Sequence, residues 1–398
     1  MEERDELAAW LRLTLTPGVG DITSRRLLAA FGLPQQVFAQ PEVALRQVVS
    51  TAQAQALLVE PPGLPALLEA TWQWLQAPAP AGAERRLLTL ADPHYPPALL
   101  AIEDPPLLLY TLGCGTIPPA AQCLAMVGSR NPTAQGRDNA HAFARHFAAT
   151  GLTVVSGLAL GIDGAAHEGA LAGAADGGCA TIAVVGTGLD RVYPQRHRAL
   201  AHRIAEHGLL VSEYPLGTPA LAANFPKRNR LIAGLSQGTL VVEAAPQSGS
   251  LITARLAVEQ GKEVFAIPGS IHSPQSRGCH ALIRQGAKLV ASGLDVLEEL
   301  RPLTTTAAAR PAAAAPAPSS PPSPSDADAD AGEAGDAPTA APHDSLLDAL
   351  GFDPVGLDAL VARTGLDAAR LQARLLELEL AGEVARLPGA LFQRIGRA

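Results

Sequence analysis

Cysteine is scarce in this sequence, and long apolar runs are missing. The 398 residues contain 4 cysteines, with no Cys-x-x-Cys pair and no histidines clustered beside them. Disulfide frameworks and zinc sites depend on such groupings, so neither is expected. The chain also lacks an uncharged apolar run of about 20 residues, as a membrane span needs, and a basic-then-apolar start, as an export signal needs. We therefore expect a soluble protein of the reducing cytoplasm, without a membrane association.

The fingerprints of nucleotide-binding enzymes are also missing. After the first predicted strand, a dinucleotide site would show GxGxxG, whereas this chain reads GSRNPTAQG, and no GxxxxGKS or GxxxxGKT occurs. Asp163 and Glu243 follow predicted strands and are candidate acids, but no nucleophile–base pair or metal cluster accompanies them. The i, i+4 spacing of Asp163 and His167 is more typical of a hydrogen bond at a helix start. We therefore predict no catalytic residue, no cofactor and no metal.

Charge is unevenly distributed along the chain. The formal net charge is −8, but much of it lies in an Ala/Pro-rich stretch around residues 326–336 and in the opening MEERDE. The rest of the chain is nearly neutral, so local basic patches stand out against it.

Four regions of different pattern follow one another. Residues 1–80 are helical, with a turn at PGVG that is similar to a helix–hairpin–helix motif. Residues 85–305 alternate short apolar runs with helical stretches, which indicates a parallel sheet covered on both faces. Residues 306–343, rich in alanine and proline, are predicted to be a disordered linker because they cannot bury a core. Residues 344–398 show two helices followed by a Pro-Gly turn between short strands, the pattern of a winged helix.

The central region is predicted to be an α/β domain of the doubly wound, Rossmann-like type. Its predicted strands end in glycine, serine or an acid, and in such sheets ligands bind outside the carboxyl ends of the strands. The strand sequences are LAMVGS, LTVVSG, TIAVVG, LLVSE, TLVVEA, EVFAIPG and AKLVAS.

Positive charge gathers near these predicted strand ends. The basic residues concerned are Arg130, Arg196 and its neighbours between 191 and 203, Lys227, Arg228, Arg230, and three cations between 277 and 288. If these regions share one sheet edge, they form a groove that can follow a phosphodiester backbone. Phe225 and Tyr193 would each stack an unpaired base, worth about 1–3 kcal/mol in such sites. Ser248, Gly249 and Ser250 open a predicted helix, which they cap and whose free amides can contact a phosphate.

Several segments resemble the DNA-processing protein A family (DprA, also called Smf). They are GSR at 128–130, VSGLALGIDGAAHEGAL at 155–171, AVVGTGLDRVYP at 183–194, SEYPLG at 212–217, FPKRNRLIAGLSQGTLVVEA at 225–244 and SGSLITARLAVEQGKEVFAIPG at 248–269. The N-terminal region is similar to the family's SAM-like domain, and the C-terminal region to its winged-helix (DML1-like) domain.

The resemblance implies a dimeric protein without enzymatic activity that binds single-stranded DNA during natural transformation. Such proteins protect the incoming strand and load the RecA recombinase onto it. The family pattern YPxxN reads YPQRH here, so that the cation falls on Arg196. Taken together, the predicted DNA-contacting residues are Gly128, Ser129, Arg130, Gly157, Arg196, Phe225, Lys227, Arg228, Asn229, Arg230, Ser248, Gly249 and Ser250.

Two alternatives remain open at this point. GTLVVE at 238–243 loosely resembles the GGxGTxxE stretch of phosphoribohydrolase-like Rossmann enzymes, but Ser236 and Gln237 stand where that pattern has its glycine pair. The winged helix is a second possible DNA contact. Its recognition helix carries Arg370 and Arg374 but also Glu377 and Glu379, a weak basic footprint.

Overall fold

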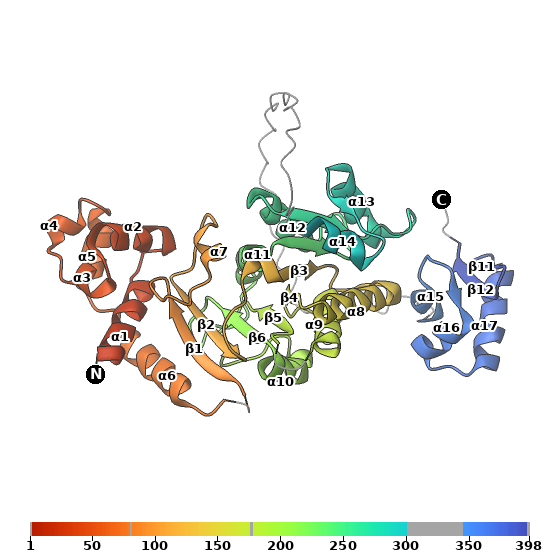
Figure 1. The fold of residues 1–398 in the computed structure, drawn as a ribbon, viewed down its shortest axis with the longest axis horizontal. Coiled ribbons are helices and arrows are strands. Elements are labelled where there is room, and N and C mark those ends of the chain that lie inside the picture. Colours follow the sequence, from red (N-terminus) through yellow and green to blue (C-terminus); the bar gives the residue numbers. More distant parts are fainter. Residues whose placement is uncertain (1, 80–81, 176–177, 301–344, 396–398) are drawn as a thin grey trace, which may run out of the picture.

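The N-terminal part of the chain is a bundle of short helices (Figure 1). The structure, a computed structural model, describes residues 2–79, 82–175, 178–300 and 345–395. Trp10, Leu27 and Leu57 lie at the centre of the bundle and are almost fully buried. The helical pattern predicted around PGVG corresponds to the first two helices. The helices are α1 (Glu2–Leu15), α2 (Asp21–Phe31), α3 (Pro34–Phe38), α4 (Glu42–Leu45), α5 (Thr51–Leu58) and α6 (Leu64–Gln76).

A nine-stranded sheet forms the middle of the molecule, in the order β1-β2-β6-β5-β4-β3-β7-β8-β9. Strands β3 to β9 pair in parallel, whereas β1 pairs with β2, and β2 with β6, in antiparallel fashion. The strands are β1 (Glu84–Thr89), β2 (Leu108–Gly113), β3 (Cys123–Val127), β4 (Thr153–Ser156), β5 (Thr181–Val184), β6 (Leu209–Ser212), β7 (Gly238–Val241), β8 (Glu263–Ala266) and β9 (Lys288–Leu289). The predicted doubly wound parallel sheet is confirmed, but the antiparallel edge was not predicted.

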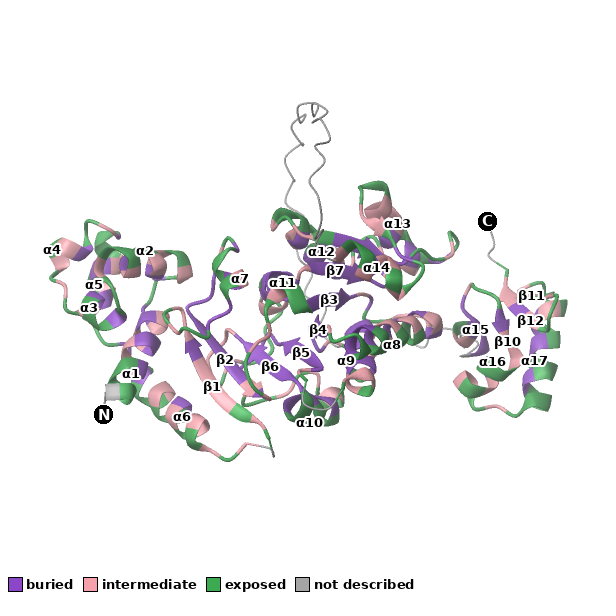
Figure 2. Ribbon diagram, viewed as in Figure 1, coloured by how far each residue is buried: buried purple, intermediate pink, exposed green. Residues whose placement is uncertain are grey.

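Helices cover both faces of this sheet. One face packs on α8 (Ala134–Ala149), α9 (Ile162–Gly173), α10 (Arg198–His207) and α14 (Gly293–Leu300), and the other on α7 (Pro97–Leu100), α11 (Asn224–Gly234), α12 (Ser250–Glu259) and α13 (Arg277–Arg284). Alternate residues of β3 face opposite layers: Leu124 and Met126 pack with α8, and Ala125 and Val127 with α11. Strands β3 to β7 are therefore buried along their whole length (Figure 2), which explains their continuously apolar sequences, whereas β1 is only partly buried.

The strand order reverses between β3 and β7. From β3 the chain winds through β4 and β5 to β6 in one direction, and from β7 it winds through β8 to β9 in the other. In doubly wound sheets the loops that leave the two strands at such a reversal diverge and open a crevice. The loops after β3 and β7 are therefore where a ligand site is expected.

A small C-terminal domain is described from residue 345 onward. It comprises α15 (Ser345–Leu350), β10 (Val355–Gly356), α16 (Leu357–Thr364), α17 (Ala368–Leu380), β11 (Val384–Leu387) and β12 (Leu391–Arg394). Its three strands pair in the order β10-β12-β11, as in a winged helix. Arg363 joins it to α8 by donating to Asp138 at 2.8 Å and to Gln135 at 2.9 Å. The predicted linker, 306–343, lies outside the described residues.

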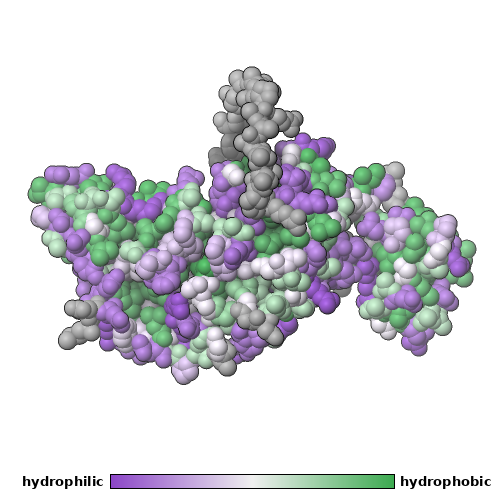
Figure 3. All heavy atoms as spheres, in the orientation of Figure 1, coloured by the Kyte–Doolittle hydropathy of each residue, from purple (hydrophilic) through white to green (hydrophobic). Residues whose placement is uncertain are grey.

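The visible surface mixes hydrophilic and hydrophobic residues (Figure 3). Within the described ranges, every helix is too short or too polar to cross a lipid bilayer.

Candidate nucleic-acid interface

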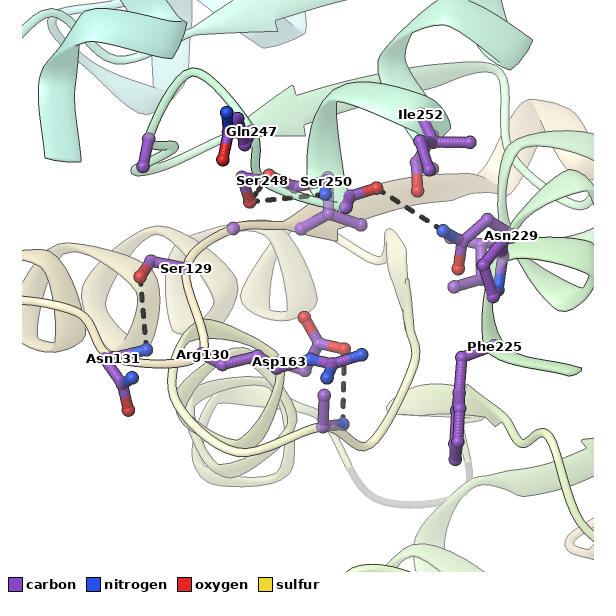
Figure 4. Close-up of a pocket in the computed structure, with 18 of the residues that line it drawn as sticks. Ser129, Arg130, Asn131, Asp163, Phe225, Asn229, Gln247, Ser248, Ser250 and Ile252 are labelled. Carbon is purple, nitrogen blue, oxygen red and sulfur yellow. Dashed lines mark hydrogen bonds between the residues drawn. The ribbon is translucent and has the colours of Figure 1, made fainter. Parts of the chain in front are cut away.

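A pocket of about 440 Å³ lies where the strand order reverses (Figure 4). The loop after β3, the loop between β7 and α12, and the first turns of α11 form its walls. The pocket brings together many of the residues predicted from sequence, namely Gly128, Ser129, Arg130, Phe225, Arg228, Asn229, Ser248, Gly249 and Ser250. Segments more than a hundred residues apart in the chain therefore meet at one sheet edge.

The loop after β3 is held tightly at its base, and its arginine is exposed. The Ser129 amide donates to the Glu243 carbonyl at 2.7 Å, and the Asn131 amide donates to the Ser129 hydroxyl at 3.1 Å. Gly128 lies so close to Ile162 that a Cβ would fall 2.6 Å from its Cγ1. Arg130 itself is exposed and extends across the pocket toward Phe225 (Figure 4). The loop thus presents one cation on a fixed backbone.

Phe225 has a planar cation and a second aromatic ring as neighbours. The Arg130 guanidinium carbon lies 5.9 Å from the centroid of the Phe225 ring. The Tyr193 ring lies 5.5 Å from Phe225, inclined by 37°, and the Tyr193 residue is 50% exposed. Gly186 packs against Phe225 so closely that a Cβ would approach the ring at 3.2 Å. Arg130, Phe225 and Tyr193, here called the basic–aromatic cluster, offer flat surfaces of the kind on which bases stack.

Arg228 is buried beneath the pocket and holds two strand ends together. It is 4% exposed, and its Nη1 donates to the Gly157 carbonyl at 2.6 Å and to the Val184 carbonyl. A Cβ at Gly157 would lie 2.5 Å from the same nitrogen, so only glycine leaves room for the guanidinium. Burial lowers the pKa of Arg228 to about 10, against the opposing effect of Asp163, so the group stays cationic at neutral pH. Gly157 therefore supports Arg228 and does not line the pocket.

Asp163 and His167 make separate hydrogen bonds. The Asp163 carboxylate accepts from the backbone amides of Gly157 at 3.1 Å and Ala159 at 3.2 Å. Burial raises its pKa, although the Arg228 charge acts in the opposite direction. The His167 Nδ1 instead meets the Thr181 hydroxyl at 2.7 Å, and burial lowers the pKa of this histidine to about 3. Asp163 thus fixes a turn at the start of α9, and the pair is not arranged as an acid–base couple.

Lys227 and Arg230 point away from the pocket. Arg230 is 9% exposed and forms a bidentate ion pair with Glu213, in which Nη1 and Nη2 lie 2.7 and 2.6 Å from the two carboxylate oxygens. Its Nε donates to the Asp104 carbonyl at 3.0 Å. The Lys227 ammonium lies 3.4 Å from an Asp21 carboxylate oxygen and 3.6 Å from Glu213. Both residues therefore tie α11 to neighbouring parts of the chain.

The other predicted cations do not share the pocket either. Arg196 is exposed on the short 3-10 turn Gln195–His197. Arg277 and Arg284 line a separate depression beside α13, and Lys288 is paired with Glu263 and Glu299. Two of the four basic regions thus meet at the pocket, through Arg130 and Arg228, and the cations of the other two regions do not line it.

The predicted cap of α12 differs from the observed one. Gly249 is the N-cap residue and carries no side-chain cap, while the hydroxyls of Ser248 and Ser250 bond to each other at 2.7 Å. The Asn229 side-chain Nδ2 donates to the Gly249 carbonyl at 3.5 Å and links α11 to this turn (Figure 4). The helix start still lies at the pocket, where its partial positive charge favours an anion.

Some pocket residues were not predicted from sequence. Asn131 and Gln247 adjoin predicted residues in the same loops, so extending the motifs by one residue would have found them. Gln275 comes from the 3-10 segment Pro274–Ser276, whose sequence carries no such signal.

Glu243, the other candidate acid, anchors α8. Its carboxylate accepts from the Thr133 amide at 2.9 Å and from the Thr133 hydroxyl at 2.6 Å, and burial raises its pKa. Across the ranges that the structure describes, there is no group of three or more histidine, cysteine, aspartate or glutamate residues that could hold a metal ion.

These features define the class of protein: a doubly wound α/β core with a basic–aromatic pocket at the strand reversal, carrying a C-terminal winged helix. The chain belongs to the DNA recombination-mediator protein A (DprA) family, whose model matches residues 86–301, and a model of the DprA winged helix domain matches residues 310–390. The predicted family and winged helix are thereby confirmed.

Individual relatives share large parts of the chain. Protein Smf of Escherichia coli is 40% identical over 332 residues, which is 83% of this chain and 82% of that protein. DNA processing protein DprA of Streptococcus pneumoniae is 46% identical over 211 residues, 53% of this chain and 73% of the relative. An X-ray structure of the Streptococcus pneumoniae protein superposes with a TM-score of 0.61 at 36% identity, covering 73% of this chain and 97% of the other.

Proposed function

We propose that the pocket at the strand reversal binds single-stranded DNA. The observation that carries the proposal is the basic–aromatic cluster, in which the exposed Arg130 lies beside Phe225, a residue of the pocket, and Phe225 lies beside Tyr193. An arginine and a helix start suit a phosphate, and the rings suit a base that is not already stacked in a duplex. The names of the relatives, DNA processing proteins, support the same reading.

The test compares single-stranded with duplex oligonucleotides by fluorescence anisotropy on the full chain. Preferential binding of the single strand, weakening as salt rises, is expected because phosphates release counterions and only unpaired bases can stack. Equal affinity for both forms would contradict the proposal.

We further propose that the chain protects single-stranded DNA during natural transformation and loads the RecA recombinase onto it, in the cytoplasm. The family description, recombination mediator, supports this role. The measurement is RecA filament formation on DNA coated with a single-strand binding protein. Acceleration by this chain is expected, and an unchanged lag would argue against recombinase loading.

A homodimer is part of this proposal. The depression beside α13 is lined by apolar residues including Ile283 and Leu289, and Leu289 is 53% exposed. Exposed apolar surface of this kind marks protein contacts. Sedimentation equilibrium is expected to give a dimer for the native chain and a monomer for Ile283→Glu. A monomeric native chain would contradict it.

We propose that the protein acts by binding alone, without enzymatic activity. The support is that Asp163 and Glu243, the two candidate acids, are both engaged by backbone amides. Release of free base from a nucleoside monophosphate by the purified chain would contradict the proposal and favour a phosphoribohydrolase-like enzyme.

A further inference from the structure

A second cleft, of about 710 Å³, lies between α10 and the antiparallel edge of the sheet. Its floor is apolar and includes Leu158, Val185 and Leu210, which are buried within the layer beneath α10. Clefts of a few hundred to a thousand cubic ångströms accommodate ligands of nucleotide size.

The rim of this cleft carries more positive than negative charge. Arg85, Arg191, Arg198 and His202 line it, together with a single acid, Asp190. That acid is already engaged: one carboxylate oxygen accepts from Arg191 at 2.9 Å and the other from the Gly217 amide at 2.9 Å. Arg198 and His202 are exposed on one side of α10. An apolar floor below an unbalanced cationic rim complements a ligand with a flat apolar part and a phosphate.

Tyr193 connects the two cavities. It lines the second cleft, and its ring lies 5.5 Å from Phe225, which lines the pocket at the strand reversal. A chain of nucleotides that crosses the basic–aromatic cluster therefore reaches the second cleft directly. Two acids line the two cavities, Asp190 in the cleft and Asp163 in the pocket, and both already accept hydrogen bonds from the chain.

We propose that the cleft beside α10 is a second nucleotide subsite, which takes an unpaired base and its phosphate from the same DNA strand. Arg198 and His202 contact the phosphate, and the floor receives the base. This inference rests on the proposed function, because the strand must first occupy the pocket at the strand reversal. The proposal gives the basic residues after position 190 a role: they lie outside that pocket but would bind the same DNA strand.

The first experiment measures the affinity of oligothymidylates of about 4 to 16 nucleotides for the full chain. The variant Arg198→Glu/His202→Glu reverses the rim of the cleft, and Arg203→Glu is the matched control, because Arg203 is an exposed cation of α10 that lines neither cavity. The rim variant is expected to bind the long oligonucleotides roughly tenfold more weakly and the shortest ones as the native chain does. The control is expected to lose less than about threefold at every length.

The second experiment uses the native chain, so that folding of a variant is not at issue. Oligonucleotides carrying 5-iodouracil at successive positions are photocrosslinked, and the linked peptides are identified by mass spectrometry. Links to Tyr193 or His202 are expected from positions that differ from those linked to Phe225.

The outcomes separate this inference from the proposed function. If the native chain binds no single strand, the proposed function fails. If it binds, but the rim variant matches Arg203→Glu at all lengths and no link forms with 189–205, the second subsite is wrong. In that case the cleft would be assigned to binding a protein partner and not a nucleotide.

Discussion

Arg130 and Arg228 both line the pocket, but they have different environments. Arg130 is exposed, with its guanidinium carbon 5.9 Å from the centroid of the Phe225 ring, whereas Arg228 is 4% exposed and donates to two strand-end carbonyls. Removing Arg228 would take this donor from both carbonyls and would remove the positive charge that acts on the buried Asp163. The exposed Arg130 is therefore assigned to ligand binding, and the buried Arg228 to holding the structure together.

This difference predicts that substituting the two arginines has very unequal effects on stability. Arg228→Ala is expected to lower the free energy of unfolding by about 3–5 kcal/mol, the cost of breaking a buried charged network. Arg130→Ala is expected to change it by less than about 0.5 kcal/mol, as for an ordinary surface position. Urea unfolding measures both. Equal losses for the two variants would contradict the structural role of Arg228.

His167, another single residue, makes the stability of the folded chain depend on pH. Its pKa falls from 6.5 to about 3 in the folded chain because burial disfavours the charged ring. The unfolded chain then binds a proton that the folded chain does not, so stability is lost as pH falls from about 6.5 toward 3. This residue contributes up to about 1.4 kcal/mol per pH unit in that window. The pKa of Asp163 is raised, so above its usual pKa of 3.8 the folded chain holds a proton that the unfolded chain has lost. Its contribution therefore lowers stability as pH rises, opposite to that of His167.

The measurement is the slope of unfolding free energy against pH between 6 and 4, for the native chain and for His167→Asn. The variant is expected to show a less positive slope, since asparagine does not titrate. The same slope in both proteins would mean that His167 is not held neutral.

At the scale of elements, the sequence predicted the parallel part of the sheet, where apolar strands alternate with helices. The continuously apolar strands from β3 to β8 predicted a parallel sheet because each is buried on both faces. The antiparallel pair β1 and β2 was missed. Arg85 and Arg86 in β1 interrupt its apolar pattern, and 18 residues separate the two strands, so no tight hairpin signal exists.

The N-terminus of helix α8 is joined to the end of β7 through Thr133, and this link can be tested by substitution. Thr133 caps α8 by accepting from the Gly136 amide at 2.9 Å, and its own hydroxyl donates to Glu243 after β7. Thr133→Ala is expected to destabilise the chain by about 1–2 kcal/mol through loss of the cap. Thr150→Ala, at the exposed far end of α8, is expected to cost less than about 0.5 kcal/mol. Comparable losses in thermal unfolding would refute this account of Thr133.

At the scale of the whole molecule, contacts between distant segments escaped prediction. Arg363 of the winged helix bonds to Asp138 of α8, and Lys227 lies by Asp21 of the helical bundle. Such pairs depend on how folded units meet, which no local pattern encodes. The sequence motifs did place Arg130 and Phe225 in one pocket, because the carboxyl ends of parallel strands converge. They did not show that Arg228 and Arg230 face inward.

The winged helix is predicted to be dispensable for the primary DNA contact. Its recognition helix pairs Arg370 with Asp367 at 3.4 Å and Arg374 with Glu377 at 2.5 Å, which reduces its positive field. All residues of the pocket lie between 127 and 275. A chain truncated after residue 305 is expected to retain single-strand affinity within about threefold, a difference of less than 1 kcal/mol. Complete loss of binding would move the main contact to the C-terminal domain.

The most direct test of the DNA-binding pocket is the salt dependence of single-strand affinity for the native chain and for Arg130→Ala. The variant is expected to bind more weakly, and its slope of log affinity against log salt is expected to be smaller by about 0.7, as for one lost phosphate contact. Unchanged affinity and slope in a variant with native stability would contradict the proposal that this pocket holds the strand.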